Sequence, residues 1–333
     1  VLDRPYIKFS NLIWGDVDCE EDFSKLCNYI YPRLRRKENP FDYENLVSYL
    51  KVIFPNEQIE NEVRITQIGG MSNKNFKVVK GCSEYVLRVP GNGSEGMVVR
   101  GNEEQNSMQA CKMGINPPVR YFNAKNGIKL ADYVKNAETL NGATIQRTSN
   151  MDKIVKIFQT LHHSHVRFGN EFNVFNEILN YEHLLEKANG RMYDGYEPVR
   201  EKVFRLEEYL NGLGVSVKPC HNDLVAENFL KAEDGTIYLI DWEYSGMNDP
   251  MWDIAALFLE NNFTDENQDY FLSHYFEGKE PANARKKILA YQILMDYLWT
   301  VWTCIKEAQG DDFGTYGMDR YTRAINNLKK IEL

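Results

Sequence analysis

The sequence has few cysteines, no long apolar run and no recognisable export signal. Six cysteines, at positions 19, 27, 82, 111, 220 and 304, show no C-x-x-C spacing and are too sparse for a disulfide scaffold in a chain this long. No apolar run approaches the roughly 20 residues of a membrane-spanning helix, and the opening VLDRPYIKFS lacks the charged-then-apolar profile of a signal peptide. We therefore expect a soluble, cytoplasmic protein with reduced thiols and no membrane partner.

Acidic residues outnumber basic ones, with 48 Asp and Glu against 39 Lys and Arg. The formal net charge of -9 argues against nucleic acid or an anionic membrane as the main partner, because either would need clustered Lys and Arg. The one basic run, RLRRK at 33–37, is short and flanked by acids, as at a solvated helix end. With 333 residues, 43% of them hydrophobic, the chain can bury a sizeable core in one two-lobed unit or two domains. The sequence leaves the oligomeric state unknown.

The first part of the chain changes from helical to strand patterning. Residues 1–60 place aromatic and charged residues at helical spacing between prolines, which favours short helices. Strands are expected at 62–68, 76–80, 84–89, 119–122 and 127–133, with a helix near 103–112. These strands predict a small antiparallel sheet.

After about residue 150 the apolar periodicity becomes helical. Helices are expected at 151–165, 175–189, 199–211, 252–261, 268–276 and 284–309. We predict an α+β fold of three parts: a helical N-terminal segment at 1–60, a small antiparallel-sheet N-lobe at 61–135 and a larger, mainly helical C-lobe at 136–333. The first segment either packs on the small lobe or regulates the protein, and packing is the interpretation we prefer.

Residues 221–253, HNDLVAENFLKAEDGTIYLIDWEYSGMNDPMWD, are the most informative stretch. Asp223 stands five residues before Asn228, which is the spacing of the kinase catalytic loop H-x-D-x-x-x-x-N. There the Asp accepts a hydroxyl proton, and the Asn and a later Asp hold metal. Such a pair alone is common in loops, but His221 before it and Asp241 thirteen residues after Asn228 make the pattern specific. His221 itself is better explained as a structural residue than as an acid or base.

A hairpin is predicted to bring the two metal-binding candidates together. The runs 229–231 and 236–240 are joined by Glu-Asp-Gly, and Asp-Gly is a strong hairpin signal. Antiparallel pairing would set the amide of Asn228 beside the carboxylate of Asp241 at one edge. Mg²⁺ prefers such oxygen ligands, together with nucleotide phosphates.

A second glycine-containing turn, between the first two predicted strands, is a candidate phosphate cover. Two glycines let backbone N–H groups approach anionic oxygens, and the polar residues that follow add donors. No G-K-[ST] follows and no helix opens there, so this is not a P-loop. Taken alone it would be an ordinary turn. The nucleotide-contacting candidates of this turn are Gly70, Met71, Ser72 and Asn73.

Arg88 is a further candidate phosphate ligand. Strand alternation puts Arg88 on the face opposite Leu87 and Val89, where a charge needs a partner. A Lys on the third strand of protein kinases contacts phosphate and a helix Glu, and Arg could do the same with a fixed fork. Glu103 is its expected partner, with Glu104 as the alternative. Without the downstream loop, a surface Arg on an edge strand would explain the residue equally simply.

Together these residues resemble the choline/ethanolamine kinase family, of the wider aminoglycoside-phosphotransferase and protein-kinase-like fold. The most specific stretches are HNDLVAENF at 221, LIDWEYSGMNDPMWDIA at 239 and YLWTVWTCIKEAQGDDFGTYG at 297. The last two look most similar to bacterial choline kinases. The resemblance implies ATP- and Mg²⁺-dependent phosphorylation of a small amino-alcohol, with Asp223 as base, Asn228 and Asp241 on metal and Arg88 on phosphate.

An acceptor pocket for choline would need aromatic faces and a carboxylate, because a quaternary ammonium donates no hydrogen bond. Trp299 and Trp302 share a helix face, although a Trp pair at this spacing is more often core. The resemblance assigns the pocket to Tyr244, Glu260, Trp299, Trp302, Phe313 and Tyr316. Tyr321 is an alternative to Tyr316.

Three other functions compete with choline phosphorylation. Ethanolamine has N–H donors, so its pocket could use more carboxylates and fewer aromatic rings. An aminoglycoside needs a broad, strongly acidic cleft, and the only acidic pair near the proposed pocket is Asp311-Asp312. A catalytically silent pseudokinase sensor would usually lack the Asp base or a metal ligand, and all three are present here.

Overall fold

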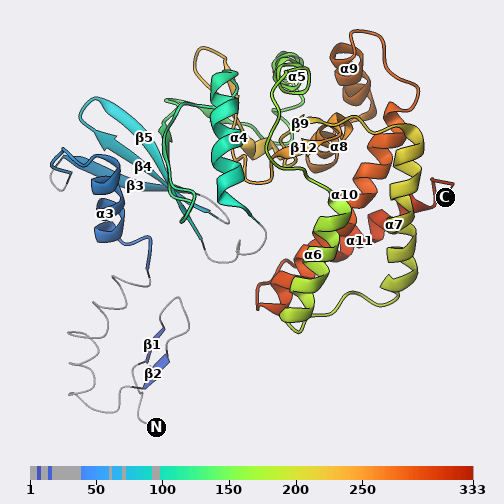
Figure 1. Cartoon of the computed structure of the whole chain (residues 1–333), viewed down its shortest axis with the longest axis horizontal. Helices are drawn as coiled ribbons and strands as arrows, with labels where there is room; N and C mark the ends of the chain where they lie inside the picture. Colours follow the sequence, from blue (N-terminus) through green and yellow to red (C-terminus); the bar gives the residue numbers. More distant parts are fainter. Residues whose placement is uncertain are drawn as a thin grey trace. The chain divides into compact units, whose positions relative to one another are not determined.

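The computed structural model describes residues 39–59, 62–69, 73–91 and 98–332, and the backbone of two short paired strands, β1 (Tyr6–Lys8) and β2 (Trp14–Asp16) (Figure 1). The chain divides into two compact units. The first comprises Val1–Ser94 and Arg120–Tyr133, and the second comprises Glu95–Val119 and Val134–Leu333.

A five-stranded sheet forms the first unit, in the order β3-β4-β5-β7-β6. Its strands are β3 (Val63–Gly69), β4 (Asn73–Lys80), β5 (Ser83–Pro90), β6 (Val119–Phe122) and β7 (Lys129–Asp132). The pairs β3–β4, β4–β5 and β5–β7 are antiparallel, as predicted.

Helix α3 (Tyr43–Ile53) covers one face of this sheet (Figure 1). Leu46, Val47 and Leu50 of α3 are buried in one cluster with Leu87 and Val89 of the sheet, which places the first unit's core between helix and strands. α3 confirms a helix within 1–60, but β1 and β2 are strands where we expected helices. The rest of that segment, up to residue 38, lies outside the described residues.

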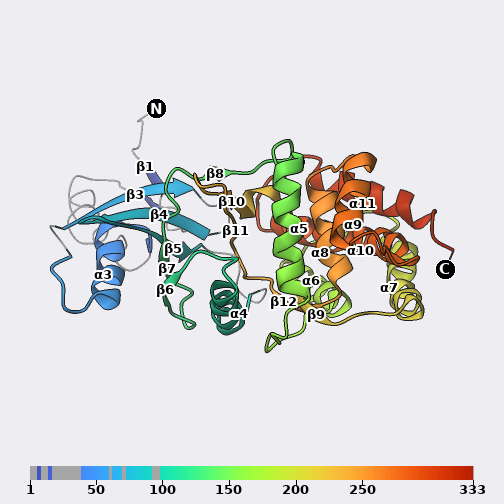
Figure 2. The same cartoon turned by 90° about the horizontal axis from the view of Figure 1, so that it is seen from above.

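The second unit is mainly helical, as predicted. Its helices are α4 (Arg100–Lys112), α5 (Thr148–His162), α6 (Val174–Lys187), α7 (Tyr196–Leu213), α8 (Pro250–Glu260), α9 (Asp265–Tyr275), α10 (Ala284–Ala308) and α11 (Tyr316–Leu328). α10 packs against α6, α7, α8 and α11 (Figures 1 and 2). α10 is long and apolar enough to span a membrane, yet 78% of that stretch is buried in the structure, as expected of a core helix.

Short strands lie in the segments between these helices. β10 (Phe229–Lys231) pairs antiparallel with β11 (Ile237–Leu239) and with β8 (Glu138–Thr139). β9 (Lys218–Cys220) pairs antiparallel with β12 (Gly246–Asn248). β8, β9 and β12 were not predicted, because each has only two or three residues and lacks a turn signal such as the Asp-Gly between β10 and β11.

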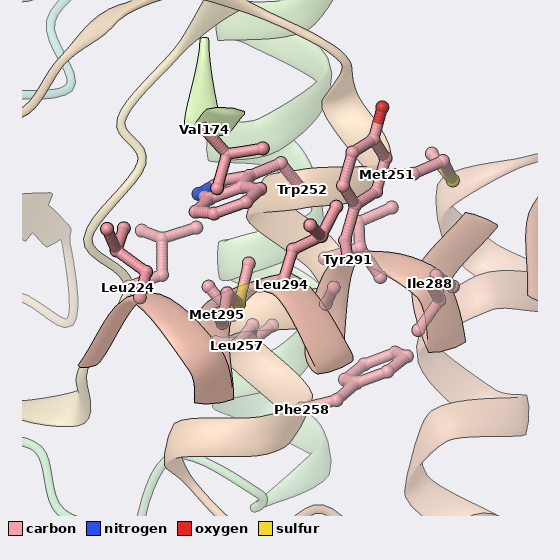
Figure 3. Close-up of a cluster of buried hydrophobic side chains, with 14 of the residues drawn as sticks. Val174, Leu224, Met251, Trp252, Leu257, Phe258, Ile288, Tyr291, Leu294 and Met295 are labelled. Atoms are coloured by element: carbon pink, nitrogen blue, oxygen red, sulfur yellow. The ribbon is translucent and has the colours of Figure 1, made fainter. Parts of the chain in front are cut away.

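The second unit's core reaches the predicted catalytic loop. Leu224, the residue after Asp223, is buried, and Figure 3 shows it in a cluster with Trp252 of α8 and Leu294 of α10. This anchorage holds one side of the loop by apolar contact, which favours a fixed loop conformation.

Two features differ from the predicted organisation. α4 groups with the helical unit, so the chain passes between the two units near residues 95, 120 and 134, whereas we placed boundaries at 60/61 and 135/136. α11 was not predicted at all. Its sequence is amphipathic, with Tyr321, Ala324 and Leu328 buried at helical spacing, and its buried positions also include Gly317 and Arg320.

Candidate active site

The β10–β11 hairpin brings the two predicted metal ligands to one end. Its register pairs Phe229 with Leu239, and Ile240 N–H donates to Asn228 O at 2.9 Å just beyond the last pair. Asn228 therefore enters the first strand where Asp241 leaves the second, as predicted. At the other end, Gly235 has a φ of 82°, a left-handed conformation that glycine adopts without strain.

Asp223 and Asn228 are in direct contact. Asn228 Nδ2 donates to the backbone oxygen of Asp223 at 2.9 Å and lies 3.4 Å from its carboxylate Oδ2. This use of the amide nitrogen leaves Oδ1 of Asn228 as the atom suited to a metal ion. The loop spacing thus joins the predicted base to the first predicted metal ligand.

His221 is a structural residue, as predicted. Its Nε2–H donates to Ile240 O at 2.9 Å, and its Nδ1 accepts Asp223 N–H at 3.3 Å. The carbonyl can only accept and the amide can only donate, so these contacts fix a neutral imidazole with its proton on Nε2. The ring also packs edge-on against Trp242. His221 therefore links the catalytic loop to the end of β11.

A buried carboxylate on α8 fixes the backbone before Asp223. Asp253 accepts His221 N–H at 2.9 Å and Asn222 N–H at 2.8 Å, and it also contacts His162 at 3.0 Å. Asn222 has a φ of 69°, which is uncommon for a residue with a side chain. Its amide donates to the backbone oxygen of Tyr244 at 2.9 Å. The surrounding hydrogen bonds hold this unusual conformation, and it directs the next residue, Asp223.

Negative charge collects around Asp223. Burial, followed by the charges of Asp241, Glu243 and Glu260, raises the pKa of the Asp223 carboxyl to about 8.

Asp241 has a φ of 66°, so both predicted catalytic carboxylates lie at or next to a left-handed residue. Such backbone conformations persist only where neighbouring structure enforces them, and they concentrate at functional sites.

Arg100, the first residue of α4, joins two acids of this region. Its Nη1 lies 2.9 Å from Glu103 Oε2 and 2.9 Å from Glu243 Oε2. Glu103 is the predicted partner of Arg88, and Glu243 is two residues beyond Asp241. One guanidinium therefore connects α4 with the loop that carries the second predicted metal ligand.

The first unit contains the other nucleotide candidates. Arg88 is buried on the sheet face opposite Leu87, as predicted, with Nη2 donating to Gly127 O at 3.1 Å and the guanidinium over the Phe122 ring. Asn73 is buried at the start of β4. Residues 70–72, which hold Gly70, Met71 and Ser72, lie outside the described residues. The pairing of Arg88 with Glu103 or Glu104 stays a prediction.

The predicted pocket aromatics form one continuous string of ring contacts. Tyr244 meets Trp299 edge-on at 6.1 Å between ring centroids, and Trp299 meets Trp302 at 5.9 Å. Trp302 meets Phe313 at 5.0 Å, and Phe313 meets Tyr316 at 6.4 Å. All five side chains retain exposed surface, which most of α10 does not. The Trp pair therefore lies at the margin of the core, with aromatic surface available to a ligand.

The charge of Asp223 acts on the tyrosines at both ends of this string. Burial is the main cause of the raised pKa of Tyr244 and of Tyr316, and the charge of Asp223 adds to both shifts. Tyr316 is 38% exposed, whereas Tyr321 is 4% exposed and packs against Tyr193. The structure thus places Tyr316 in the aromatic string and Tyr321 in the core.

Comparison with known proteins agrees with this geometry. The choline/ethanolamine kinase family profile matches residues 65–325, well over half of the chain. The chain belongs to the choline/ethanolamine kinase family. It is 32% identical to protein LicA of Haemophilus influenzae over 298 residues, 86% of this chain and 87% of that protein.

Solved structures of this family have the same fold. Choline kinase LicA from Streptococcus pneumoniae is 41% identical, with a TM-score of 0.75 over 85% of this chain and 99% of that one. A structure of LicA in complex with AMP is 40% identical, with a TM-score of 0.76 over 87% of this chain and 99% of that one. The predicted α+β, protein-kinase-like fold is confirmed.

Family resemblance pointed to Glu260, but it did not reveal the partner of that residue. Arg320 Nη2 donates to Glu260 Oε2, and Arg320 Nη1 lies 3.2 Å from Asp296 Oδ1. The carboxylate predicted to face a substrate cation is therefore already paired with a cation of the chain.

Several residues of this kinase site were missed by sequence reasoning. Arg100 contacts Glu243, which lies 143 residues further along the chain, and Asp253 contacts residues about 30 positions before it. No local sequence pattern marks such pairs. Tyr181 of α6 hydrogen-bonds the side chain of Tyr244, and burial raises its pKa. Only Arg320 gave a local signal, because it follows Tyr316 by four residues, the spacing of neighbours on a helix face.

Proposed function

We propose that this protein is an ATP-dependent choline kinase that makes phosphocholine by direct in-line transfer. The observation that carries the choice of acceptor is the aromatic string from Tyr244 to Tyr316, with the charge of Asp223 acting on the tyrosines at both ends. Aromatic faces attract a quaternary ammonium, which offers no hydrogen-bond donor. The proximity of Asp223 would place the choline hydroxyl next to a proton acceptor.

Asp223 is proposed to accept the hydroxyl proton as the oxygen attacks phosphorus. Its backbone is fixed by Asn222 and Asp253, and its carboxylate is approached by the Asn228 amide. Trp299, Trp302 and their neighbours would orient the substrate by its ammonium end. No covalent enzyme intermediate is expected, because a positioned hydroxyl can attack directly.

Asn228 and Asp241 are proposed to hold Mg²⁺. The donor set fits a hard cation, since the hairpin brings an amide and a carboxylate to one end, where the charges of Asp241 and Glu243 act on Asp223. When bound, Mg²⁺ neutralises charge on the transferring phosphoryl group. We propose ATP as the donor, and the structure of LicA in complex with AMP supports a nucleotide site in this fold. Nucleotide contacts are proposed for Gly70, Met71, Ser72, Asn73, Arg88 and Glu103.

The test is release of ADP by the purified protein with Mg²⁺, ATP and one acceptor at a time: choline, ethanolamine or kanamycin. We expect the highest kcat/KM with choline, and phosphocholine as product by ³¹P NMR. Omitting Mg²⁺ should abolish turnover. Faster reaction with ethanolamine or kanamycin would overturn the choice of choline. ATP binding without phosphorylation of any acceptor would favour the pseudokinase alternative.

A further inference from the structure

Arg320 is a buried cation beside the proposed acceptor pocket that the mechanism above does not use. It is 5% exposed on α11, and its guanidinium lies 4.6 Å from the centre of the Tyr316 ring. Its two terminal nitrogens contact Glu260 of α8 and Asp296 of α10. One side chain thus contacts the last ring of the aromatic string and two acids from different helices.

The two acids are compensated differently. Asp296 is also bound by Arg323, whose Nε and Nη2 donate to its two oxygens at 2.7 and 2.6 Å. Glu260 has Arg320 as its ion-pair partner, and its other oxygen, Oε1, is buried with no hydrogen-bond partner among the described residues. Together, Glu260, Asp296, Arg320 and Arg323 carry no net formal charge. The charge of Glu260 is therefore compensated, and its Oε1 remains an acceptor without a hydrogen bond among the described residues.

Ammonium groups differ in what they need from such a site. A primary ammonium is strongly hydrated and brings three N–H donors, which must find acceptors when it leaves water. A quaternary ammonium has no donors and is stabilised by aromatic faces. Arg320 neutralises the charge of Glu260 and occupies one of its two oxygens. The site therefore stabilises a quaternary ammonium better than a primary ammonium.

We infer that Arg320 is a specificity-determining residue, which positions Glu260 and Tyr316 and cancels the charge of Glu260 so that the pocket selects quaternary over primary ammonium. This inference rests on the proposed function and names how the same site chooses its acceptor. Arg323 is the matched control, because it hydrogen-bonds Asp296 but no hydrogen bond or ion pair joins it to Glu260 or Tyr316 among the described residues.

The experiment compares kcat/KM for choline with kcat/KM for ethanolamine in wild type, Arg320→Met and the matched control Arg323→Met. Arg320→Met exposes a charged Glu260 with two acceptor oxygens, so the choline-to-ethanolamine ratio should fall by about tenfold or more, mainly through KM. Arg323→Met should keep the ratio within about twofold of wild type, because its partner Asp296 retains Arg320. KM for ATP should stay unchanged in both.

A double variant tests whether Arg320 acts through Glu260. In Glu260→Gln/Arg320→Met the uncompensated charge is gone, so the ratio should recover to within about threefold of wild type. Titration of Trp fluorescence with tetramethylammonium and with methylammonium gives a readout apart from turnover. The affinity for tetramethylammonium relative to that for methylammonium should fall in Arg320→Met. If Arg320→Met does not fold, Arg320→Lys keeps the charge without the planar fork and should give a smaller fall in the ratio.

Equal ratios in Arg320→Met and Arg323→Met would overturn the inference, as would an Arg320→Met effect that persists undiminished in the Glu260→Gln background. Failure of the proposed function looks different, because wild type would then phosphorylate neither amino-alcohol. Wild-type activity with unchanged selectivity in the variants refutes the role of Arg320 alone.

Discussion

Asp223 owes its position to the residue before it. Asn222 adopts a left-handed backbone and uses its amide, its N–H and its carbonyl in bonds to Tyr244, Asp253 and Trp252. These bonds prevent the relaxation that a strained residue would otherwise undergo. The carboxylate is therefore placed before substrate arrives, which is the condition for effective proton transfer.

Replacing Asp223 by Asn should remove the base while keeping the side chain's shape. We expect kcat to fall by about 100- to 10,000-fold, the usual contribution of a positioned general base. Nucleotide affinity, measured by equilibrium binding, should change little. Asp234→Asn, at the exposed turn of the same hairpin, is the control and should retain wild-type kcat. Parallel losses of kcat and nucleotide affinity in Asp223→Asn would argue against its role as base.

At the scale of elements, the site depends on α4 being joined to the loop after β11. Arg100 provides this connection through Glu103 and Glu243, whose side chains are 0% and 5% exposed. Two acids so poorly solvated are costly to keep ionised without a nearby cation. Arg100 therefore stabilises the arrangement of two elements that are far apart in sequence.

Arg100→Met should lower the free energy of unfolding by about 3 kcal/mol, the usual cost of removing one member of a buried ion pair. Urea unfolding followed by Trp fluorescence measures it. Adding Glu243→Gln should recover part of the loss, because one acid no longer needs compensation. Arg205→Met, at an exposed position of α7, should change stability by less than about 0.5 kcal/mol. If Arg100→Met were as stable as Arg205→Met, the guanidinium shared by Glu103 and Glu243 would contribute nothing to stability.

Elements with local signals were predictable from sequence, and elements defined by distant contacts were not. The β10–β11 hairpin follows from Asp234-Gly235 between two apolar runs, and its register places Asn228 and Asp241 correctly. The burial of Arg320 on α11 was not predictable, because this residue is stabilised by Glu260 and Asp296, acids 60 and 24 residues away. Whether a charged position is buried depends on such partners, and a single sequence does not reveal them.

At the scale of the whole molecule, the two units have separate hydrophobic cores. Leu50 of α3 belongs to the first cluster, and Leu294 of α10 belongs to the second. Asp223, Asn228, Asp241 and the whole aromatic string lie in the second unit, whereas Arg88 and Asn73 lie in the first. The residues proposed for the acceptor pocket therefore belong to the second unit, and the proposed nucleotide contacts Arg88 and Asn73 belong to the first.

Leu50→Ala should separate the two functions. We expect this cavity to destabilise the first unit by about 2 to 5 kcal/mol and to weaken nucleotide binding, while the acceptor pocket keeps its affinity for tetramethylammonium. Four of the five tryptophans, Trp242, Trp252, Trp299 and Trp302, lie in the second unit, so Trp fluorescence reports mainly on that unit.

Leu294→Ala is the matched variant in the second unit's core. We expect it to weaken tetramethylammonium binding and to leave nucleotide binding less affected. Its cavity lies in the second unit's core, on the helix that carries Trp299 and Trp302, so tetramethylammonium affinity should fall and the fluorescence-detected transition should move to lower denaturant. Because Leu50 and Leu294 are both 0% exposed, the two substitutions remove the same group from equally buried sites. If Leu50→Ala weakened tetramethylammonium binding as much as Leu294→Ala does, the two cores could not be energetically separate, and acceptor recognition would depend on both units.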